Sequence, residues 1–82
     1  MPLVGGYSLV SNPLNDSDVQ NIIKLLIYQY GNVINSGILV SVERQVVNGL
    51  NYKLTISFDQ SSTMQYIIIV YKTLSGEYSI TS

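Results

Sequence analysis

The feature that most constrains the fold of this chain is a single helical stripe within residues 15–31. Apolar side chains recur there at the three- and four-residue spacing of one helix face. Asp16 is placed to cap the start, Asp18 lies in the first turn where the helix dipole favours a carboxylate, and Gly31 follows the last stripe residue. We therefore predict one helix that buries a continuous stripe made of Val19, Ile22, Ile23, Leu26, Ile27 and Tyr30.

The rest of the sequence alternates with a period of two, which indicates β-strands. We expect Ile38, Val40 and Val42 to lie on one face of a strand, with Ser41 and Glu43 on the other. Further strands are predicted near the start, in "GYSLVS", and at residues 52–59, 64–72 and 78–82.

Two turns connect the last strands. Asn48-Gly49 is a strong signal for a tight hairpin, because both residues tolerate the positive φ that such a turn demands. Gly76 marks a second turn. Val46 and Val47 directly precede the first turn, although a solvated hairpin tip is normally polar. A function that uses apolar side chains at this tip would explain them.

A helix with one apolar face and a sheet with one apolar face can bury these faces against each other when the sheet wraps the helix. The sequence therefore predicts an α+β fold: a single α-helix wrapped by a four- to five-stranded antiparallel β-sheet, forming one domain over residues 1–82. In the strand over residues 64–72, we expect Tyr66, Ile68 and Val70 to face the helix and Ile67, Ile69 and Tyr71 to face outward. That outer apolar patch indicates either self-association or a surface covered by polar neighbours.

The composition argues against several classes of function. The chain has no histidine and no cysteine, which removes the usual general base, the catalytic thiol and the commonest metal ligands. Its five acidic residues are scattered and show no metal-ligand spacing, so we expect no enzyme activity, no cofactor and no metal. With four Lys and Arg residues and a net charge of −1, we expect no nucleic-acid partner. No stretch approaches the roughly 20 apolar residues of a membrane span, so no membrane partner is expected.

The expected location is cytoplasmic. The start, "MPLVGGYS", lacks the basic and apolar regions of a signal peptide, and the absence of cysteine is commoner inside cells. The alternative is a secreted mature form to which Met1 was added.

Three segments of the chain resemble the cystatins, which are inhibitors of papain-like cysteine proteases. They are "LVGG" at 3–6, "QVVNG" at 45–49 and the helix segment "IIKLLIYQY" between them. The central motif of the family is Gln-Val-Val-Ala-Gly, so this chain differs by having Asn48 in place of alanine. "TLSG" at 73–76 is similar to the Ser-Leu-Pro-Gly of the cysteine-free stefin branch, but lacks the proline, and the Pro-Trp of secreted members is also absent.

The resemblance implies a reversible, tight-binding inhibitor that blocks the active-site cleft of papain and cathepsin-like proteases. An N-terminal segment and two hairpin loops would enter the cleft as one wedge. Leu3 and Val4 would occupy substrate subsites, and Gly5 would let the backbone lie close to the enzyme, so Gly5→Glu should weaken papain inhibition at least tenfold. The implied protease-binding residues are Leu3, Val4, Gly5, Gly6, Gln45, Val46, Val47, Asn48, Gly49, Leu74, Ser75 and Gly76.

Each of these assignments has an alternative. Gly5-Gly6 could be a flexible terminus, Val46-Val47 an ordinary strand end, and Leu74 a single exposed leucine without function. The whole chain could instead be a non-inhibitory binding or structural module with the cystatin fold. Such a module would act through strand-edge pairing, or as a domain-swapped dimer that opens at the first hairpin so that the helix and the first strands exchange. The tight Asn-Gly turn favours a closed hairpin and therefore a monomer.

Overall fold

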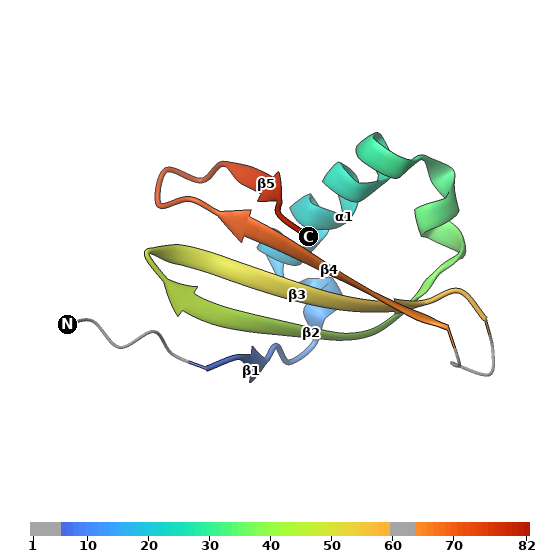
Figure 1. The fold of residues 1–82 in the computed structure, drawn as a ribbon, viewed down its shortest axis with the longest axis horizontal. Coiled ribbons are helices and arrows are strands. Elements are labelled where there is room, and N and C mark those ends of the chain that lie inside the picture. Colours follow the sequence, from blue (N-terminus) through green and yellow to red (C-terminus); the bar gives the residue numbers. More distant parts are fainter. Residues whose placement is uncertain (1–5, 60–63) are drawn as a thin grey trace.

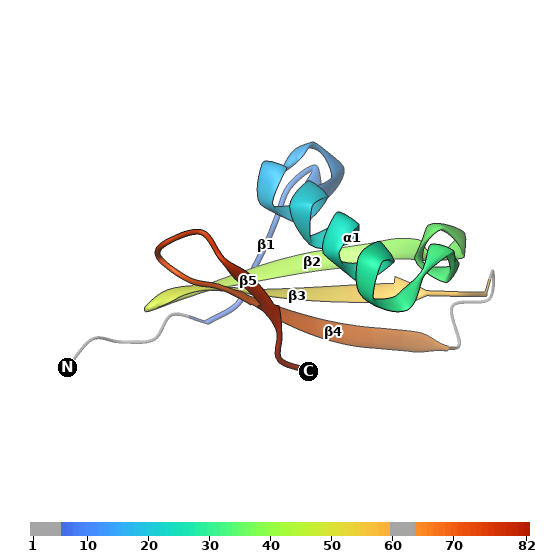
Figure 2. The same ribbon diagram turned by 90° about the horizontal axis from the view of Figure 1, so that it is seen from above.

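The computed structural model describes residues 6–59 and 64–82. Within these residues, one α-helix lies across one face of a five-stranded antiparallel sheet, and the other face of the sheet is left open (Figures 1 and 2). The strands follow one another across the sheet in chain order. This arrangement confirms the predicted α+β fold. The elements are β1 (Ser8–Leu9), a 3₁₀ turn (Pro13–Asn15), α1 (Ser17–Tyr30), a second 3₁₀ turn (Asn32–Ser36), β2 (Ile38–Val47), β3 (Gly49–Ser57), β4 (Gln65–Lys72) and β5 (Tyr78–Ile80).

Helix α1 begins and ends where the sequence predicts. The Asp16 carboxylate accepts hydrogen bonds from the backbone N–H groups of Asp18 (2.9 Å) and Val19 (3.1 Å), which satisfies donors that would otherwise have no partner. Gly31 ends the helix with a φ of +87°, a conformation that favours glycine. In the described part of the chain, no helix has the length and apolar character needed to cross a membrane.

The core forms between the helix stripe and the inner face of the sheet. Val19, Ile22 and Leu26 of α1 are fully buried. From the sheet they meet a set of buried side chains: Val42, Tyr52, Leu54, Ile56 and Val70. Tyr30, the last residue of the predicted stripe, is 51% exposed, because the core ends before the last turn of α1.

One prediction for β2 was wrong. Leu39 pairs with Ile56 and Ser41 pairs with Thr55, so the register shifts by one residue and Val40 is left over as a bulge. As a result Leu39 packs on the core, whereas Ile38 and Val40 are about half exposed. Strict alternation failed here because residues 38–40 are all apolar, and each of them can lie on either face of the strand. The position of the bulge therefore cannot be predicted from the pattern of apolar residues.

The faces of β4 are as predicted. Tyr66, Ile68 and Val70 lie opposite Ile56, Leu54 and Tyr52 of β3, and residues that are directly opposite each other share a face of the sheet. These three side chains face the helix. The residues that alternate with them, Ile67, Ile69 and Tyr71, therefore lie on the outer face. The outer face is not uniform, because Ile67 is 58% exposed whereas Ile69 and Tyr71 are half-buried.

Candidate functional site

Two hairpin connections lie at the same end of the molecule in both views (Figures 1 and 2): the tip between β2 and β3, and the loop between β4 and β5. β1 runs antiparallel to β2, with Ser8 opposite Arg44, so Gly6 and Tyr7 lie toward this end as well. We call this part of the surface the hairpin end and define it as Gly6, residues 46–49 and residues 73–77.

The first hairpin turns on Asn48, which stands alone between Val47 of β2 and Gly49 of β3. Gly49 has a φ of +121°. Among the described residues other than glycine, positive φ occurs only at Asn12, so Asn48 itself makes no use of the conformation that an Asn-Gly turn permits. Gly49 is therefore the residue that supplies the positive φ of this turn.

Tyr71 of β4 holds this tip from the neighbouring strand. Its hydroxyl donates a hydrogen bond to the backbone carbonyl of Asn48. A Cβ atom on Gly49 would lie 2.5 Å from the carbonyl oxygen of Lys72 and 2.7 Å from the Tyr71 hydroxyl. Glycine is thus required at position 49 by space as well as by φ. From the sequence we expected Tyr71 only to face outward, and no residue near the hairpin in the chain indicates its contact with Asn48.

The apolar side chains at the first tip are not absorbed by the core. Val46 is 63% exposed, and Val47 is half-buried on the opposite face of β2. Behind them, Gln45 accepts a hydrogen bond from the side chain of Asn51 across the hairpin (3.1 Å). The tip therefore presents an aliphatic side chain on a strand pair that is braced from behind.

The second loop is held by its own hydrogen bonds. The Thr73 N–H donates to the Glu77 carbonyl (2.8 Å), the Gly76 N–H donates to the Thr73 carbonyl (3.0 Å), and the Glu77 N–H donates to the Thr73 hydroxyl (3.0 Å). The Ser75 hydroxyl lies 2.9 Å from that of Thr73. Leu74 projects from this loop with 80% of its surface exposed. The loop thus exposes a leucine on a backbone whose conformation is already restricted by hydrogen bonds.

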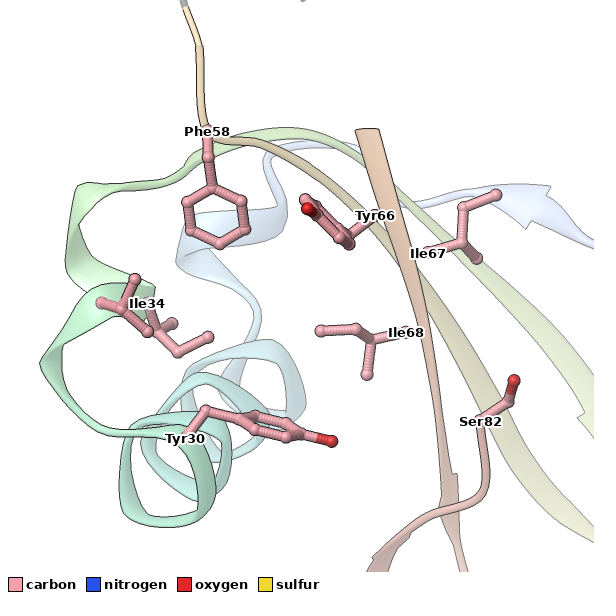
Figure 3. A pocket seen from close by; sticks show the side chains of 8 residues that line it. Tyr30, Ile34, Phe58, Tyr66, Ile67, Ile68 and Ser82 are labelled. Carbon is pink, nitrogen blue, oxygen red and sulfur yellow. The ribbon is translucent and has the colours of Figure 1, made fainter. Parts of the chain in front are cut away.

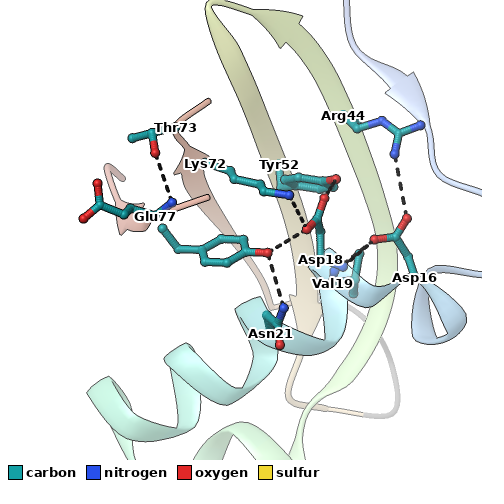
Figure 4. A network of polar contacts seen from close by, with 10 residues as sticks. Asp16, Asp18, Val19, Asn21, Arg44, Tyr52, Lys72, Thr73 and Glu77 are labelled. Atoms are coloured by element: carbon teal, nitrogen blue, oxygen red, sulfur yellow. Dashed lines mark hydrogen bonds and ion pairs between the residues drawn. The ribbon is translucent and has the colours of Figure 1, made fainter. Parts of the chain in front are cut away.

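A polar cluster behind the hairpin end joins the helix to three strands (Figure 4). The Asp18 carboxylate accepts hydrogen bonds from the Tyr52 hydroxyl (2.7 Å), the Tyr78 hydroxyl (2.6 Å) and the Lys72 ammonium group (2.7 Å). These donors come from β3, β5 and β4 respectively. We call these four residues the Asp18 cluster. It ties the first turn of α1 to the strands that carry both hairpin connections.

The cluster keeps Asp18 ionised. Burial by itself raises the pKa of this carboxyl, but the hydrogen bonds from Lys72, Tyr78 and Tyr52 outweigh that effect and lower the pKa to about 2. Burial, together with the hydrogen bond to Asp18, raises the pKa of Tyr52 to about 12. Near neutral pH the cluster is therefore a carboxylate surrounded by protonated donors. From the sequence we expected Asp18 only to favour the helix dipole, because its three donors lie 34 to 60 residues away in the chain.

The structure brings the predicted residues of the two loops to one end, while part of the N-terminal segment is not covered. Leu3, Val4 and Gly5 lie outside the described residues, so their predicted role stays a prediction. Gly6 is exposed at the hairpin end, with no other atom within 4 Å of where its Cβ would lie.

The chemistry of the hairpin end is that of a binding surface. Val46 and Leu74 offer aliphatic area, and the turn residues between them are uncharged apart from Glu77 at the edge of the second loop. Among residues 6–59 and 64–82, no group of three or more His, Cys, Asp or Glu side chains is placed to hold a metal ion. Such a surface suits insertion into an apolar groove of another protein.

Comparison with known proteins gives one informative similarity. No protein-family model matches the chain. No solved structure matches it. The chain is 30% identical over 77 residues to "Cysteine proteinase inhibitor 8" of Oryza sativa subsp. japonica, an alignment that covers 87% of this chain and 62% of that protein. The chain therefore spans about three-fifths of the length of this relative. In sequence the chain is similar to this cysteine proteinase inhibitor, and its single helix packed on an antiparallel sheet is a cystatin-like arrangement.

Proposed function

We propose that the chain is a reversible, tight-binding inhibitor of papain-like cysteine proteases, and that the hairpin end is the part that enters the active-site cleft. The observation that carries the proposal is the exposure of Val46 and Leu74 on two braced hairpin connections at one end of the sheet. The similarity to a cysteine proteinase inhibitor of rice supports the same class of partner.

The energetic argument starts from exposed apolar area on a rigid support. Val46 is 63% and Leu74 80% exposed, and burial of such side chains stabilises a complex by about 1.5–3 kcal/mol each when complete. The two side chains therefore contribute about 2–4 kcal/mol. Because the loops already hold their shape, little ordering entropy is lost on binding. Further contacts from the N-terminal segment would bring the interface toward the common size of about 800 Å² per partner.

Resistance to cleavage follows from the same rigidity. A protease needs the scissile carbonyl at attack distance and in line with its nucleophile. At the first tip, the Asn48 carbonyl is engaged by the Tyr71 hydroxyl, and at the second, Thr73 and Glu77 hold each other's backbone. The proposed complex thus places apolar side chains in the cleft without offering a peptide bond to the catalytic thiolate.

The test is a titration of active papain with the purified protein, followed by inhibition constants for Val46→Ser and Leu74→Ser. We expect residual activity to fall linearly to a one-to-one endpoint, and each variant to weaken inhibition at least tenfold. Val33→Ser is the matched control, because Val33 is 56% exposed in the 3₁₀ turn at the opposite end of the sheet. Full papain activity at equimolar protein would reject the proposal, as would equal losses in the control.

The second candidate function is a non-inhibitory binding module that opens at its first hairpin and exchanges the helix and first strands with another chain. Asn48 in place of the alanine of the cystatin motif motivates it. In the structure β2 and β3 close on each other within one chain, with Val46 opposite Leu50, so we propose that the inhibitory unit is a single chain. Gel filtration separates the two readings, and the cytoplasmic location expected from the sequence stays a prediction.

A further inference from the structure

The outer edge of β4 is open over half of its length. β5 pairs with β4 at residues 70–72, and the backbone of Ile69 is engaged by the C-terminal residues: its N–H donates to the Ser82 carbonyl (2.9 Å) and its carbonyl accepts from the Thr81 N–H (2.9 Å). In the described part of the chain, nothing pairs with this edge from Gln65 to Ile68.

The direction of the free groups follows from the alternation of a strand. Since the N–H and carbonyl of Ile69 point to the open edge, those of Ile67 and Gln65 point the same way. Two residues thus present four backbone groups for pairing. The side chains around them are apolar and accessible: Tyr66 is 49% exposed on the helix side and Ile67 58% on the outer side.

This edge lacks the protection found on the opposite side of the sheet. There, β1 covers part of β2, and the bulge at Val40 distorts the remainder, which is a common defence against unwanted pairing. β4 has a regular register over its whole length. The sequence from residue 60 to residue 71 contains no charged residue and no proline. Charges and prolines are the usual means of blocking strand addition.

We propose that this edge of β4 pairs with the same edge of a second copy of the chain, antiparallel and about a two-fold axis at Tyr66. Gln65 of each copy then lies opposite Ile67 of the other, and all four free backbone groups on each copy find partners. An axis at Ile67 would instead place Gln65 opposite Ile69, whose backbone is already bonded to residues 81 and 82.

A second copy fits better than an unrelated peptide because of the charge distribution. Near a two-fold axis each residue lies close to its own copy, so any charge there would lie close to a like charge. The uncharged stretch from residue 60 to residue 71 removes that repulsion without providing a charged site for a different partner.

The side chains on the helix side continue this interface. Tyr66 borders an apolar groove of about 500 Å³, and its ring meets Phe58 edge-to-face with 5.5 Å between centroids (Figure 3). Tyr30, Ile34 and Ile68 line the same groove. Opposite residues of an antiparallel pair that do not share hydrogen bonds have Cα atoms about 4.5 Å apart, so the two Tyr66 rings would lie together and each groove would be partly covered.

The proposed contact is short, so the dimer should be weak and should leave inhibition intact. The pairing involves three residues per chain, Gln65, Tyr66 and Ile67, and is small beside a standard interface of about 1,600 Å². Gln65–Ile68 lies toward the end of the sheet opposite to the hairpin end, so both hairpin ends stay accessible in the pair (Figure 1). The proposal does not depend on the inhibitory function, and unlike hairpin exchange it keeps each β2–β3 hairpin closed.

Sedimentation equilibrium at protein concentrations of about 10 µM and about 1 mM tests the proposal, because the dissociation constant of a weak dimer falls between these two values. We expect the average mass to rise from 9.1 kDa toward twice that value. Ile67→Lys should abolish the rise, because it places like charges beside the axis. Leu9→Lys is the matched control, since Leu9 is 74% exposed on the edge strand β1 at the other side of the sheet, and it should dimerise as the unaltered chain does.

Amide hydrogen exchange of the unaltered chain gives a second readout that does not depend on a variant folding correctly. The amides of Gln65 and Ile67 should exchange more slowly at the higher concentration, whereas that of Asn48 should not change. A mass that stays at 9.1 kDa at both concentrations would overturn the proposal. It would also be overturned if Ile67→Lys still dimerised and the amides that exchange more slowly lay in the first hairpin.

Discussion

Replacement of Asp18 by asparagine tests how much the Asp18 cluster contributes to the stability of the support behind the hairpin end. The variant keeps the shape of the side chain and removes its charge. In the folded protein the pKa of Asp18 is lowered from 3.8 to about 2. The side chain is only 18% exposed, so screening by solvent is limited. At about 1.4 kcal/mol for each pKa unit, the depressed pKa corresponds to about 2 kcal/mol of folding free energy at neutral pH.

The sign of the pH dependence follows from the depressed pKa. Well above pH 3.8 the carboxyl is ionised in the folded and the unfolded chain, and its full contribution to stability is present. As the pH falls from 3.8 toward 2, the unfolded chain takes up the proton before the folded chain does, and the contribution declines. The difference in unfolding free energy between the unaltered protein and Asp18→Asn should therefore be about 2 kcal/mol at pH 7 and nearly absent at about pH 2.

Urea unfolding of both proteins at a series of pH values, followed by circular dichroism, measures this difference directly. Glu77→Gln is the control, because Glu77 is exposed in the second loop, and its unfolding free energy should stay within about 0.5 kcal/mol of the unaltered protein. Equal stability of Asp18→Asn at pH 7 would refute the role assigned to the cluster. A difference that persists unchanged to pH 2 would show that shape, and not charge, is what the residue provides.

The first hairpin yields two further predictions. Gly49→Ala should lower the unfolding free energy by about 1–3 kcal/mol, measured by urea unfolding, because a Cβ there meets the Lys72 carbonyl and φ is +121°; an unchanged value would mean that the tip relaxes freely. Tyr71→Phe removes the donor to the Asn48 carbonyl and should cost about 1 kcal/mol of stability while weakening papain inhibition several-fold. Inhibition identical to that of the unaltered chain would show that the tip needs no support from β4.

Local chemistry made the helix and the hairpins predictable. The N-cap at Asp16, the stripe through Val19, Ile22 and Leu26, and the terminating Gly31 each act within a few residues of the chain, so their pattern can be read without a structure. The same holds for the turn at Gly49, whose φ only glycine adopts readily.

The bulge at Val40 and the contacts that brace the hairpin end were beyond the reach of sequence reasoning. The bulge lies within a run of apolar residues that satisfies both faces of a strand, so only pairing with β3 decides which residue is left over. Tyr71 reaches Asn48 from 23 residues away. These contacts depend on the register between strands, and a register leaves no trace in local composition.

The sequence by itself determined that this chain forms one capped helix and a set of antiparallel strands with aliphatic residues at a glycine turn. Only the tertiary structure decided that both hairpin connections lie at one end, and that Asp18 gathers donors from three strands behind them. The physical reason is that periodicity, caps and turns act over a few residues. The meeting of distant side chains, by contrast, is set by how the strands pair and by which face of the sheet the helix covers.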